Sequence, residues 1–361
     1  MVYFLIFFVA ACVRIALWLL EALAGIGDDF HPDSVYHLET ARYLIARNFD
    51  GWSDYALNNE LYAVIAAAVL QIVDSITVLR VANLVIGSTI PVLCFRLFRA
   101  VGCSGMTVWA ATLFASLLPY QAHLSIHALK DTAFLFSGIA LTFYLIRRKI
   151  IMALLMAALL IGLRTYLGAM IAGVMLALFF GRSRLFLPVV GVLFFGVLLF
   201  LAGEYAEFLL ERQTEIIEGR EFFSSVQVYR PNPDNYLSLL LFAVTAPIRQ
   251  IFVPSLLDVR SFMDLAFGVH VLFYQCLFAA TAIAIFRRHQ ALRESAQKKP
   301  LGGYLIVVCV TTYALSIAFI DVVTPGIGPV VRYRELSFFL LAIACFVVLD
   351  YCRRSAIVHT S

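Results

Sequence analysis

Runs of about twenty apolar residues recur along this chain, from Val2 to Cys352, and only short polar breaks separate most of them. A run of that length lets an α-helix cross a hydrocarbon core ~30 Å thick. The composition agrees, because 62% of the 361 residues are hydrophobic and only 14% are charged, against roughly 25% charged residues in soluble domains. The sequence therefore predicts an all-α, polytopic membrane protein.

The basic residues are distributed unevenly over the polar breaks. Five breaks and the C-terminal tail hold 14 of the 27 lysines and arginines, together with a single acidic residue, Glu294. The five basic breaks contain Arg96/Arg99, Arg147–Lys149, Arg182/Arg184, Arg287–Lys299 and Arg353/Arg354. Since loops rich in Lys and Arg stay in the cytoplasm, the acidic breaks are predicted to lie on the outer face of the membrane. Chemistry that uses carboxylates would then take place outside the cytoplasm.

A transmembrane bundle of about ten spans satisfies this charge rule with both termini in the cytoplasm. The predicted spans are 2–24, 79–98, 105–122, 131–146, 150–164, 166–181, 185–203, 262–286, 302–320 and 336–352. The first outside loop, 25–79, contains two segments of helical periodicity, Ser34–Asn48 and Glu60–Val73, which we expect to lie on the membrane surface. A second outside region, 204–260, combines a polar loop with an interfacial or re-entrant segment. Because no internal repeat is visible, residues 1–361 are predicted to form one integral membrane domain.

Other function classes receive no support from the sequence. It contains no P-loop, no GxGxxG after a strand, no GxSxG and no HExxH, so nucleotide binding is not indicated. The seven cysteines show no CxxC spacing, which argues against a structural zinc site or a disulfide framework. The basic residues serve orientation rather than form one patch, so we expect no nucleic-acid partner.

The first outside loop opens with the segment Asp28–His37, which places three carboxylates and two imidazoles within ten residues. Such a group can supply a general base or bind a cation. The candidate residues are Asp33, Asp29, Tyr36 and, as weaker members, His37 and His31. The two aspartates would be catalytic carboxylates or metal ligands, and Tyr36 and His37 would contact the substrate. The alternative is an ordinary loop end, in which Asp33 or Ser34 caps the following helix.

Lys130 and Asp131 stand where the fourth predicted span begins. An unpaired charge at membrane depth costs ~2.5–3.5 kcal/mol on insertion scales, so both side chains need water or a partner. Asp131 is therefore a further candidate catalytic carboxylate, and Lys130 is a candidate substrate-binding cation. The alternative is a local ion pair at the interface, with the Lys130 ammonium reaching toward water.

Three arginines on the predicted outer face run against the positive-inside rule. Arg332 and Arg334 flank Tyr333 in the predicted loop 321–335, and Arg164 stands in the turn between two spans. The forked donors of a guanidinium suit a phosphate group. These arginines and Tyr333 are therefore candidate substrate-binding residues. The alternative is a set of structural Arg–Glu pairs between loops.

In their order along the chain, these motifs resemble the polytopic glycosyltransferases that use lipid-linked sugars, the GT-C class, which includes protein O-mannosyltransferases and aminoarabinose transferases. The resemblance covers roughly residues 1–181 and 320–352. It rests on Asp33–Ala41, a helix from Leu61, a span from Arg80 to Arg99, Leu117–Pro119 followed by Asp131, the turn Gly162–Tyr166, and Arg332–Glu335. Two departures stand out, since the Lys-Asp pair at 130–131 differs from the usual second motif and region 204–260 has no counterpart.

This resemblance implies an inverting transfer of a sugar from a polyprenyl-phosphate donor to a glycan, lipid or protein acceptor. The reaction would take place on the outer face of the cytoplasmic (inner) membrane, with the lipid bilayer as a further partner. Asp33, or Asp29, would be the general base and Asp131 the second acidic position. Arg332 and Arg334 would bind the lipid phosphate. No cofactor is required, and a divalent metal near Asp29 and Asp33 is compatible with this chemistry.

Two other functions stay open at this point. A polysaccharide polymerase or ligase of the O-antigen type also has many spans, outside arginines and a polyprenyl-linked donor. A transporter or flippase for lipid-linked sugars is the alternative from a different class. Transporters place ionisable residues near the middle of spans and interrupt helices at matching positions in two halves. Here the charges gather at the outer ends of spans, and Arg14 alone lies deep in a run, which favours a surface site.

Overall fold

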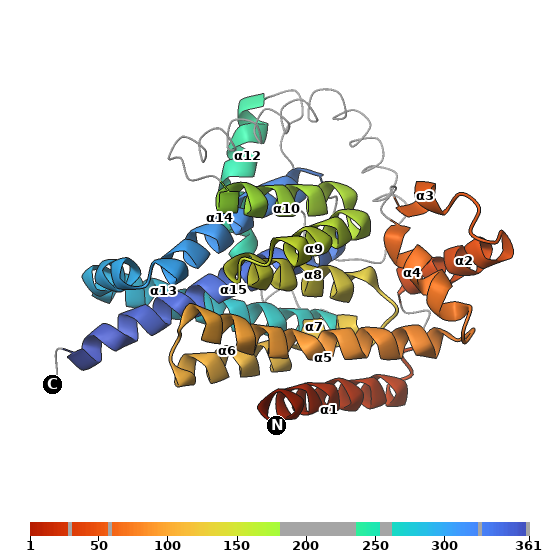
Figure 1. Cartoon of the computed structure of the whole chain (residues 1–361), viewed down its shortest axis with the longest axis horizontal. Helices are drawn as coiled ribbons and strands as arrows, with labels where there is room; N and C mark the ends of the chain where they lie inside the picture. Colours follow the sequence, from red (N-terminus) through yellow and green to blue (C-terminus); the bar gives the residue numbers. More distant parts are fainter. Residues whose placement is uncertain (28–30, 57–59, 181–235, 253–261, 324–326, 359–361) are drawn as a thin grey trace. The chain divides into compact units, whose positions relative to one another are not determined.

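The computed structural model describes residues 1–27, 31–56, 60–180, 236–252, 262–323 and 327–358. Within these ranges every regular element is a helix, as the sequence predicts (Figure 1). Asp29, the predicted span 185–203 and most of region 204–260 lie outside the described residues. The chain divides into two compact units. The first unit comprises residues 1–172, 281–305 and 345–361, and the second unit comprises residues 173–280 and 306–344.

Among the described residues, five helices are long and apolar enough to cross a membrane. They are α1 (Val2–Leu23), α5 (Ile76–Val101) and parts of α13 (Phe262–Lys298), α14 (Pro300–Val323) and α15 (Ile327–Val358). A sixth span arises if α7 (Pro119–Ser125) and α8 (Lys130–Ile146), whose axes differ by 115°, form one broken span. These helices indicate a multi-pass membrane protein, in agreement with the sequence.

The predicted number of ten spans is not confirmed. Three predicted spans correspond to short apolar helices, namely α6 (Gly105–Leu117, 13 residues), α9 (Ile150–Leu163, 14 residues) and α10 (Thr165–Phe180, 16 residues). At 1.5 Å per residue these helices are shorter than the ~17–25 residues that a full span needs. The predicted span 105–122 ends early because Pro119 starts a separate helix. A proline disfavours helical geometry in the residue before it, and Leu118 is indeed extended, with ψ 113°.

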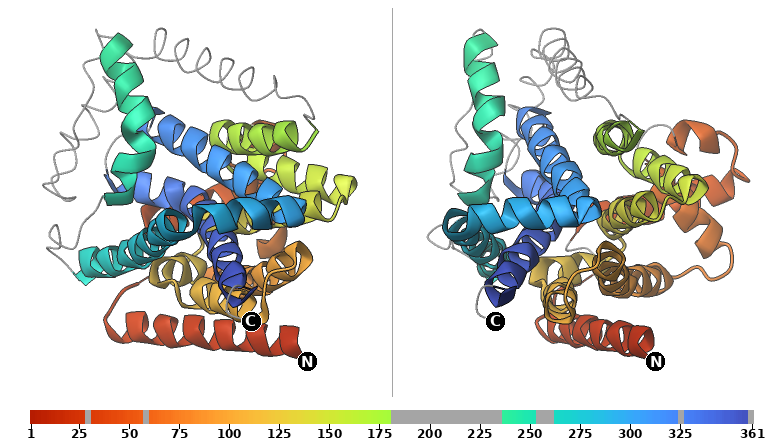
Figure 2. Two further views of the ribbon diagram at one scale, coloured as in Figure 1. Left: turned by 90° about the vertical axis from the view of Figure 1, so that its left-hand side faces the viewer. Right: turned by 60° about the vertical axis from the view of Figure 1, so that its left-hand side comes forward.

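Helix α5 is the central helix of the first unit and packs against α1, α6 and α8. Ser75 caps its N-terminus by accepting a hydrogen bond from the Thr77 backbone N–H (3.3 Å). Gly102 ends it in the left-handed conformation, with φ +79°, which glycine adopts without strain. The chain then turns within three residues, so that α6 lies beside α5, and α1 runs alongside both helices (Figures 1 and 2).

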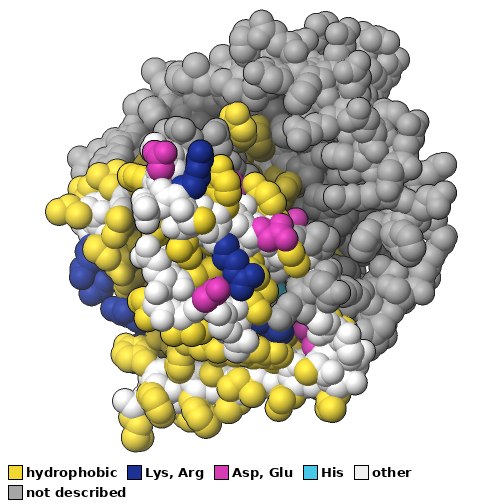
Figure 3. All heavy atoms as spheres, turned by 90° about the vertical axis from the view of Figure 1, so that its right-hand side faces the viewer, with side chains coloured by type: hydrophobic (Ala, Val, Ile, Leu, Met, Phe, Trp, Pro, Cys, Tyr) yellow, Lys and Arg dark blue, Asp and Glu magenta, His cyan; other side chains and the backbone are white. Residues whose placement is uncertain are grey.

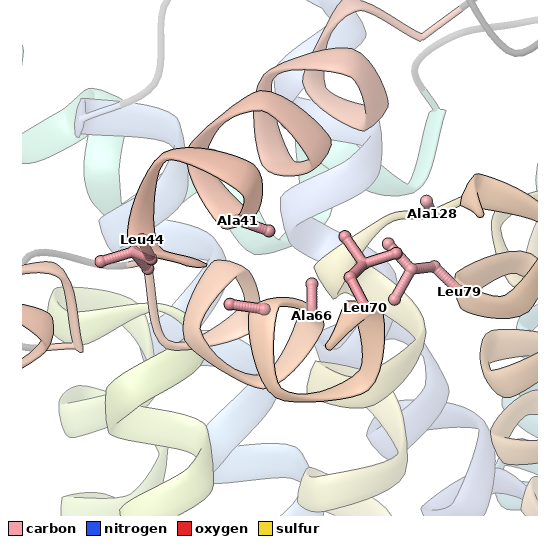
Figure 4. Packing of buried hydrophobic residues seen from close by; sticks show 7 residues of the cluster. Ala41, Leu44, Ala66, Leu70, Leu79 and Ala128 are labelled. Atoms are coloured by element: carbon pink, nitrogen blue, oxygen red, sulfur yellow. The ribbon is translucent and has the colours of Figure 1, made fainter. Parts of the chain in front are cut away.

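Helices α2 (Pro32–Ala46), α3 (Trp52–Tyr55) and α4 (Leu61–Leu70) fold together in the first predicted outside loop. Their apolar side chains share one buried cluster with α5 and with the segment that joins α7 to α8 (Figure 4). Its members are Ala41, Leu44, Ala66, Ala67, Leu70, Leu79 and Ala128. The alanines leave room for the helices to approach closely. The two helices predicted for this loop are confirmed, with ends shifted by up to three residues.

The second unit contains α12 (Tyr236–Arg249), the short 3-10 helix η3 (Gln250–Phe252) and parts of α13, α14 and α15. Its helices are joined by buried hydrogen bonds, for example between the hydroxyl groups of Ser316 and Ser337 (2.6 Å). Helix α15 begins at Ile327, so Arg332–Glu335 lies within a helix. The prediction of a loop over 321–335 is therefore wrong for 321–323, which end α14, and for 327–335, which begin α15. Pro329 is tolerated there because the N–H groups of a first helical turn have no partner inside the helix.

Candidate functional site

The segment Ile126–Leu129 interrupts the helix between α7 and α8 and lies buried inside the first unit. A broken helix leaves backbone groups without their usual partners, and these must be paired when water is excluded. Two side chains of α5 provide that pairing. Arg80 Nε donates to the Ile126 carbonyl (2.7 Å), and Asn83 Nδ2 donates to two further carbonyls of the segment (2.7 and 2.8 Å). We call this segment the α7–α8 break.

Five ionisable side chains meet next to this break, and we call them the charged cluster: His37, Glu60, Lys130, Asp131 and Arg164. The Arg164 guanidinium forms an ion pair with the Asp131 carboxylate. The Lys130 ammonium lies 3.8 Å from one oxygen of Glu60, and Nδ1 of His37 lies 3.3 Å from the other. Lys130, Asp131 and Arg164 are only 5–7% exposed. The cluster thus holds two carboxylates, two cations and an imidazole in a nearly dry environment.

Separate elements bring these side chains together. Asp131 stands in the first turn of α8, where the positive end of the helix dipole stabilises a carboxylate. Arg164 occupies the non-helical residue between α9 and α10. Glu60 precedes α4, and His37 lies on α2. The sequence analysis identified four of these residues as candidates, namely His37, Lys130, Asp131 and Arg164. It missed Glu60, which it treated only as the first residue of a predicted helix.

Buried polar atoms near the break lack the partners that such atoms usually have. His37 makes no hydrogen bond to a described residue, although its Nδ1 lies 3.3 Å from Glu60, and the hydroxyl groups of Ser34 and Thr132 also lack such a hydrogen bond. Buried polar groups in folded proteins are nearly always paired. Ser34 and His37 are one turn apart on α2, and Thr132 follows Asp131 on α8. These atoms are suited to bind a polar ligand.

Asp33 and Tyr36 lie on the same helix as His37. Asp33 is half-buried in the first turn of α2, after Pro32, and it interacts electrostatically with Lys130 of the charged cluster. Tyr36 is 50% exposed and its ring packs edge-on against His37, with 5.7 Å between the ring centres. Asp33 thus lies within electrostatic range of Lys130 and on the same helix as His37.

Tyr62 connects the charged cluster to the α7–α8 break. It is buried, shares a hydrogen bond with the side chain of Asn83, and packs edge-on against His37 at 5.1 Å between ring centres. Burial raises the pKa of the Tyr62 phenol far above its ordinary value. The hydroxyl group therefore stays protonated and can act as a hydrogen-bond donor beside Asp131.

A second polar group in the first unit consists of three histidines and one glutamate, His31, His123, His127 and Glu21, which we call the histidine cluster. Glu21, near the end of α1, contacts Nδ1 of His123 (2.6 Å) and Nε2 of His127 (3.0 Å). His31, just before α2, faces His123 with 2.8 Å between the two Nε2 atoms. The sequence singled out His31 only as a weak candidate and missed the other three residues. The spacing of His123 and His127, four residues apart, was the available signal.

Arg332, Tyr333 and Arg334 belong to the second unit and lie on α15. Residues two apart on a helix point to different faces, so Arg332 and Arg334 do not form one phosphate-binding fork. Arg334 is 3% exposed, donates to the carbonyl and the side-chain oxygen of Gln250 (3.0 and 2.9 Å), and lies over the Phe338 ring at 4.7 Å. Arg332 is half-buried. Arg334 is thus engaged inside the second unit, and Arg332 is the less buried arginine of the motif.

Glu335, the residue after this motif, is also engaged within the second unit. Its carboxylate contacts Nε2 of His270 (2.8 Å) and accepts a hydrogen bond from the Tyr274 hydroxyl (3.0 Å). These two contacts use both oxygens of the Glu335 carboxylate. The alternative of structural Arg–Glu pairs between loops stays open, because the glutamates of 204–221 lie outside the described residues.

Comparison with known proteins adds no family. No protein-family model matches the sequence, and no curated protein or solved structure matches it either. A functional assignment therefore depends on the geometry of the first unit and on the motifs of the sequence.

Proposed function

We propose that this chain is a membrane glycosyltransferase that moves a sugar from a polyprenyl-phosphate donor to an acceptor on the outer face of the cytoplasmic membrane. The observation that carries the proposal is the charged cluster, in which buried cations and carboxylates lie against a helix break and beside Asp33. Ionisable groups held at the end of apolar helices are costly, and they generally mark functional sites.

The proposed sugar transfer needs only a few catalytic groups. The acceptor hydroxyl gives its proton to the Asp33 carboxylate as its oxygen bonds to the anomeric carbon of the sugar. The bond from that carbon to the phosphate oxygen breaks at the same time, and polyprenyl phosphate leaves with the electron pair. Attack from the face opposite the leaving group inverts the anomeric centre. A general base of this kind typically accelerates a reaction 10²–10⁴-fold.

The residues of the charged cluster have distinct roles in this proposal. Lys130 neutralises the phosphate as negative charge develops on it. Asp131 is engaged by Arg164, so we assign it the positioning of that guanidinium rather than proton transfer. His37 and Tyr36 contact the sugar or the acceptor. Arg332 is an additional candidate for the lipid phosphate.

The helices of the first outside loop fit a position at the membrane–water interface. Figure 3 shows the face on the side of α2–α4, where acidic and basic side chains stand among hydrophobic ones. Tyr36, Tyr43 and Trp52 are about half exposed on these helices, and Tyr and Trp are enriched at the level of lipid head groups. A glycan, lipid or protein acceptor would approach from this side in the proposal.

The test is turnover by the purified protein in detergent, with a panel of polyprenyl-phosphate sugars and detection of released polyprenyl phosphate. Asp33→Asn should lower the rate about 10²–10⁴-fold. The matched control is Asp74→Asn, because Asp74 is an exposed carboxylate that pairs with Arg42 (3.0 Å) outside the charged cluster. Absence of turnover with every polyprenyl-phosphate sugar would refute the proposal. Joining of lipid-pyrophosphate oligosaccharides instead would establish a polymerase or ligase.

One observation favours a second function, transport of the lipid-linked sugar. The α7–α8 break, with its 115° bend, is the kind of interrupted helix that binds substrates and ions in transporters. Arg14 in α1 is also fully buried within a span. Uptake of a fluorescent lipid-linked sugar across the bilayer of proteoliposomes, unchanged in Asp33→Asn, would support transport over transfer.

A further inference from the structure

The imidazoles of the histidine cluster converge on one point. The centres of the His31, His123 and His127 rings lie 4.7–5.0 Å apart in each pair. One nitrogen of each ring lies within 4.8 Å of a nitrogen of both others. His123 and His127 are buried and His31 is half-buried. Three imidazoles from two distant parts of the sequence, His31 and the segment His123–His127, thus enclose a common small volume.

The donor chemistry of this group matches a transition-metal ion. Neutral imidazole nitrogen is the common protein ligand of Zn²⁺, and it also suits Cu, Fe and Ni. A tetrahedral Zn²⁺ bound at 2.0–2.1 Å separates its ligand nitrogens by roughly 3.3 Å. The observed spacing, from 2.8 Å for His31–His123 to at most 4.8 Å, brackets this value. Small ring rotations therefore suffice to form the site.

Glu21 supplies the support that metal-binding histidines require. Such histidines usually pass their second ring N–H to a carboxylate, which fixes the tautomer and the ring orientation. Glu21 contacts Nδ1 of His123 at 2.6 Å, and this arrangement directs Nε2 of His123 toward His31. The same carboxylate contacts His127 through its second oxygen at 3.0 Å. One buried carboxylate therefore orients two of the three candidate ligands.

We propose that His31, His123 and His127 bind a transition-metal ion of the Zn²⁺ class, with Glu21 as the orienting carboxylate. The ion joins the entrance to α2, through His31, to α7 and the α7–α8 break, through His123 and His127, and Glu21 connects α1 to the two latter histidines. Asp33 follows His31 by two residues, and Lys130 follows His127 by three. The metal thereby fixes the start of α2 against the break. Its ligands differ from Asp29 and Asp33, the residues near which the sequence allows a metal, and the proposal does not depend on the proposed transfer reaction.

The competing interpretation is a purely structural group, in which His31, His123 and Glu21 form a chain of hydrogen bonds without an ion. Both interpretations predict that the histidines matter for stability. They differ in whether the protein contains a stoichiometric metal and whether removal of that metal changes the protein.

The experiment measures metal in the full-length protein, purified in detergent with a tag that contains no histidine. We expect about one Zn²⁺ per chain after incubation with excess Zn²⁺ and gel filtration, with three protein ligands and an open fourth position. His31→Ala and His127→Ala should each abolish stoichiometric Zn²⁺, and Glu21→Gln should weaken its affinity roughly 10–100-fold. His270→Gln is the matched control, since His270 is a buried histidine that contacts a carboxylate, Glu335, at 2.8 Å in the second unit. That variant should bind Zn²⁺ as the wild type does.

Two further readouts keep the test decisive if a variant folds poorly. Co²⁺ added to metal-free wild-type protein should give the visible absorption bands of a tetrahedral site with nitrogen ligands. Chelation should lower the thermal midpoint of the wild type, since a ligand that binds only the folded state stabilises it. Wild-type protein that takes up neither Zn²⁺ nor Co²⁺ would overturn the proposal. Undiminished Zn²⁺ binding in His31→Ala and His127→Ala would overturn it equally.

Discussion

Asp131 and Arg164 are both about 5% exposed and paired with each other. Burial of their charges costs free energy. Two charges lose their hydration on burial, and their mutual attraction compensates for that loss only when the geometry is good. Apolar side chains of similar size usually stabilise a protein as well as such a pair does. In the proposed function, the reason for this pair is the position that Asp131 gives to the Arg164 guanidinium.

Comparison of a single and a double variant separates stability from function at this pair. Arg164→Leu leaves the Asp131 carboxylate buried without its strongest partner and should cost about 3–5 kcal/mol in unfolding free energy. Arg164→Leu combined with Asp131→Leu should recover most of that loss, because no unpaired charge is then left from the pair. Thermal unfolding in detergent measures both variants.

Turnover by the same two variants completes the test. The double variant should fold like the wild type and still lack transfer activity. A double variant that is both stable and fully active would show that the pair is structural, and would remove Asp131 and Arg164 from the proposed site.

At the scale of residues, the sequence identified charges but not their partners. Lys130, Asp131 and Arg164 stand out because a charge beside an apolar run is visible in any sequence. Glu60 and Glu21 do not, since nothing in the sequence tells which side chain a glutamate at a helix end will meet. His31 and His123 are 92 positions apart, and their contact depends on the packing of α1, α2 and α7, which no local pattern encodes.

At the scale of elements, the α7–α8 break decides the geometry of both polar clusters. His127 lies within it, His123 precedes it, and Lys130 and Asp131 follow it. The break keeps its shape because α5 supplies three side-chain hydrogen bonds to its carbonyls. Its conformation therefore depends on Arg80 and Asn83 rather than on its own sequence.

Asn83 offers a direct test of this dependence. Asn83→Leu removes two hydrogen bonds of 2.7 and 2.8 Å and leaves two buried carbonyls unpaired, at about 1–3 kcal/mol each. Ser88→Ala is the control on the same helix, since its hydroxyl donates only to the carbonyl of Leu84 four residues earlier (2.7 Å). We expect Asn83→Leu to lower the thermal midpoint clearly and Ser88→Ala to change it little. Equal midpoints for the two variants would contradict the role of α5 in holding the break.

The sequence predicted most of the individual helices but not this break. Helices α1, α2, α4 and α5 follow from apolar runs and helical periodicity, and their bounds agree with the prediction to within a few residues. The residues 123–131 were predicted to be a short outside segment between two spans. The structure adds that these residues are buried, because Arg80 and Asn83, which look like ordinary polar residues of a span, pair with the backbone of the break.

At the scale of the whole molecule, the charge distribution is the main evidence for orientation. The exposed arginines and lysine of the Arg147–Lys149 turn follow α8, and the exposed pair Arg42–Asp74 lies on the other predicted side of the membrane. The positive-inside rule places the first group in the cytoplasm. The proposed reaction on the outer face requires that α2–α4 lie on the opposite side.

Cysteine labelling in intact cells tests this orientation. Asp74 and Lys149 are both exposed, so Asp74→Cys and Lys149→Cys can each react with a maleimide that does not cross membranes. The exposed native cysteines, Cys12 and Cys276, are first replaced by serine. We expect Asp74→Cys to be labelled in intact cells and Lys149→Cys only after the membrane is opened.

The two positions act as controls for each other, because labelling of both after permeabilisation shows that each cysteine is reactive. The reverse pattern would place α2–α4 and Asp33 in the cytoplasm, where sugars are normally activated on nucleotides. The charged cluster would then face a compartment in which a polyprenyl-phosphate donor offers no advantage, and transfer on the outer face would be excluded. The predicted pattern would put Asp33 where lipid-linked donors are the available source of activated sugar, and the dependence of turnover on Asp33 becomes the deciding measurement.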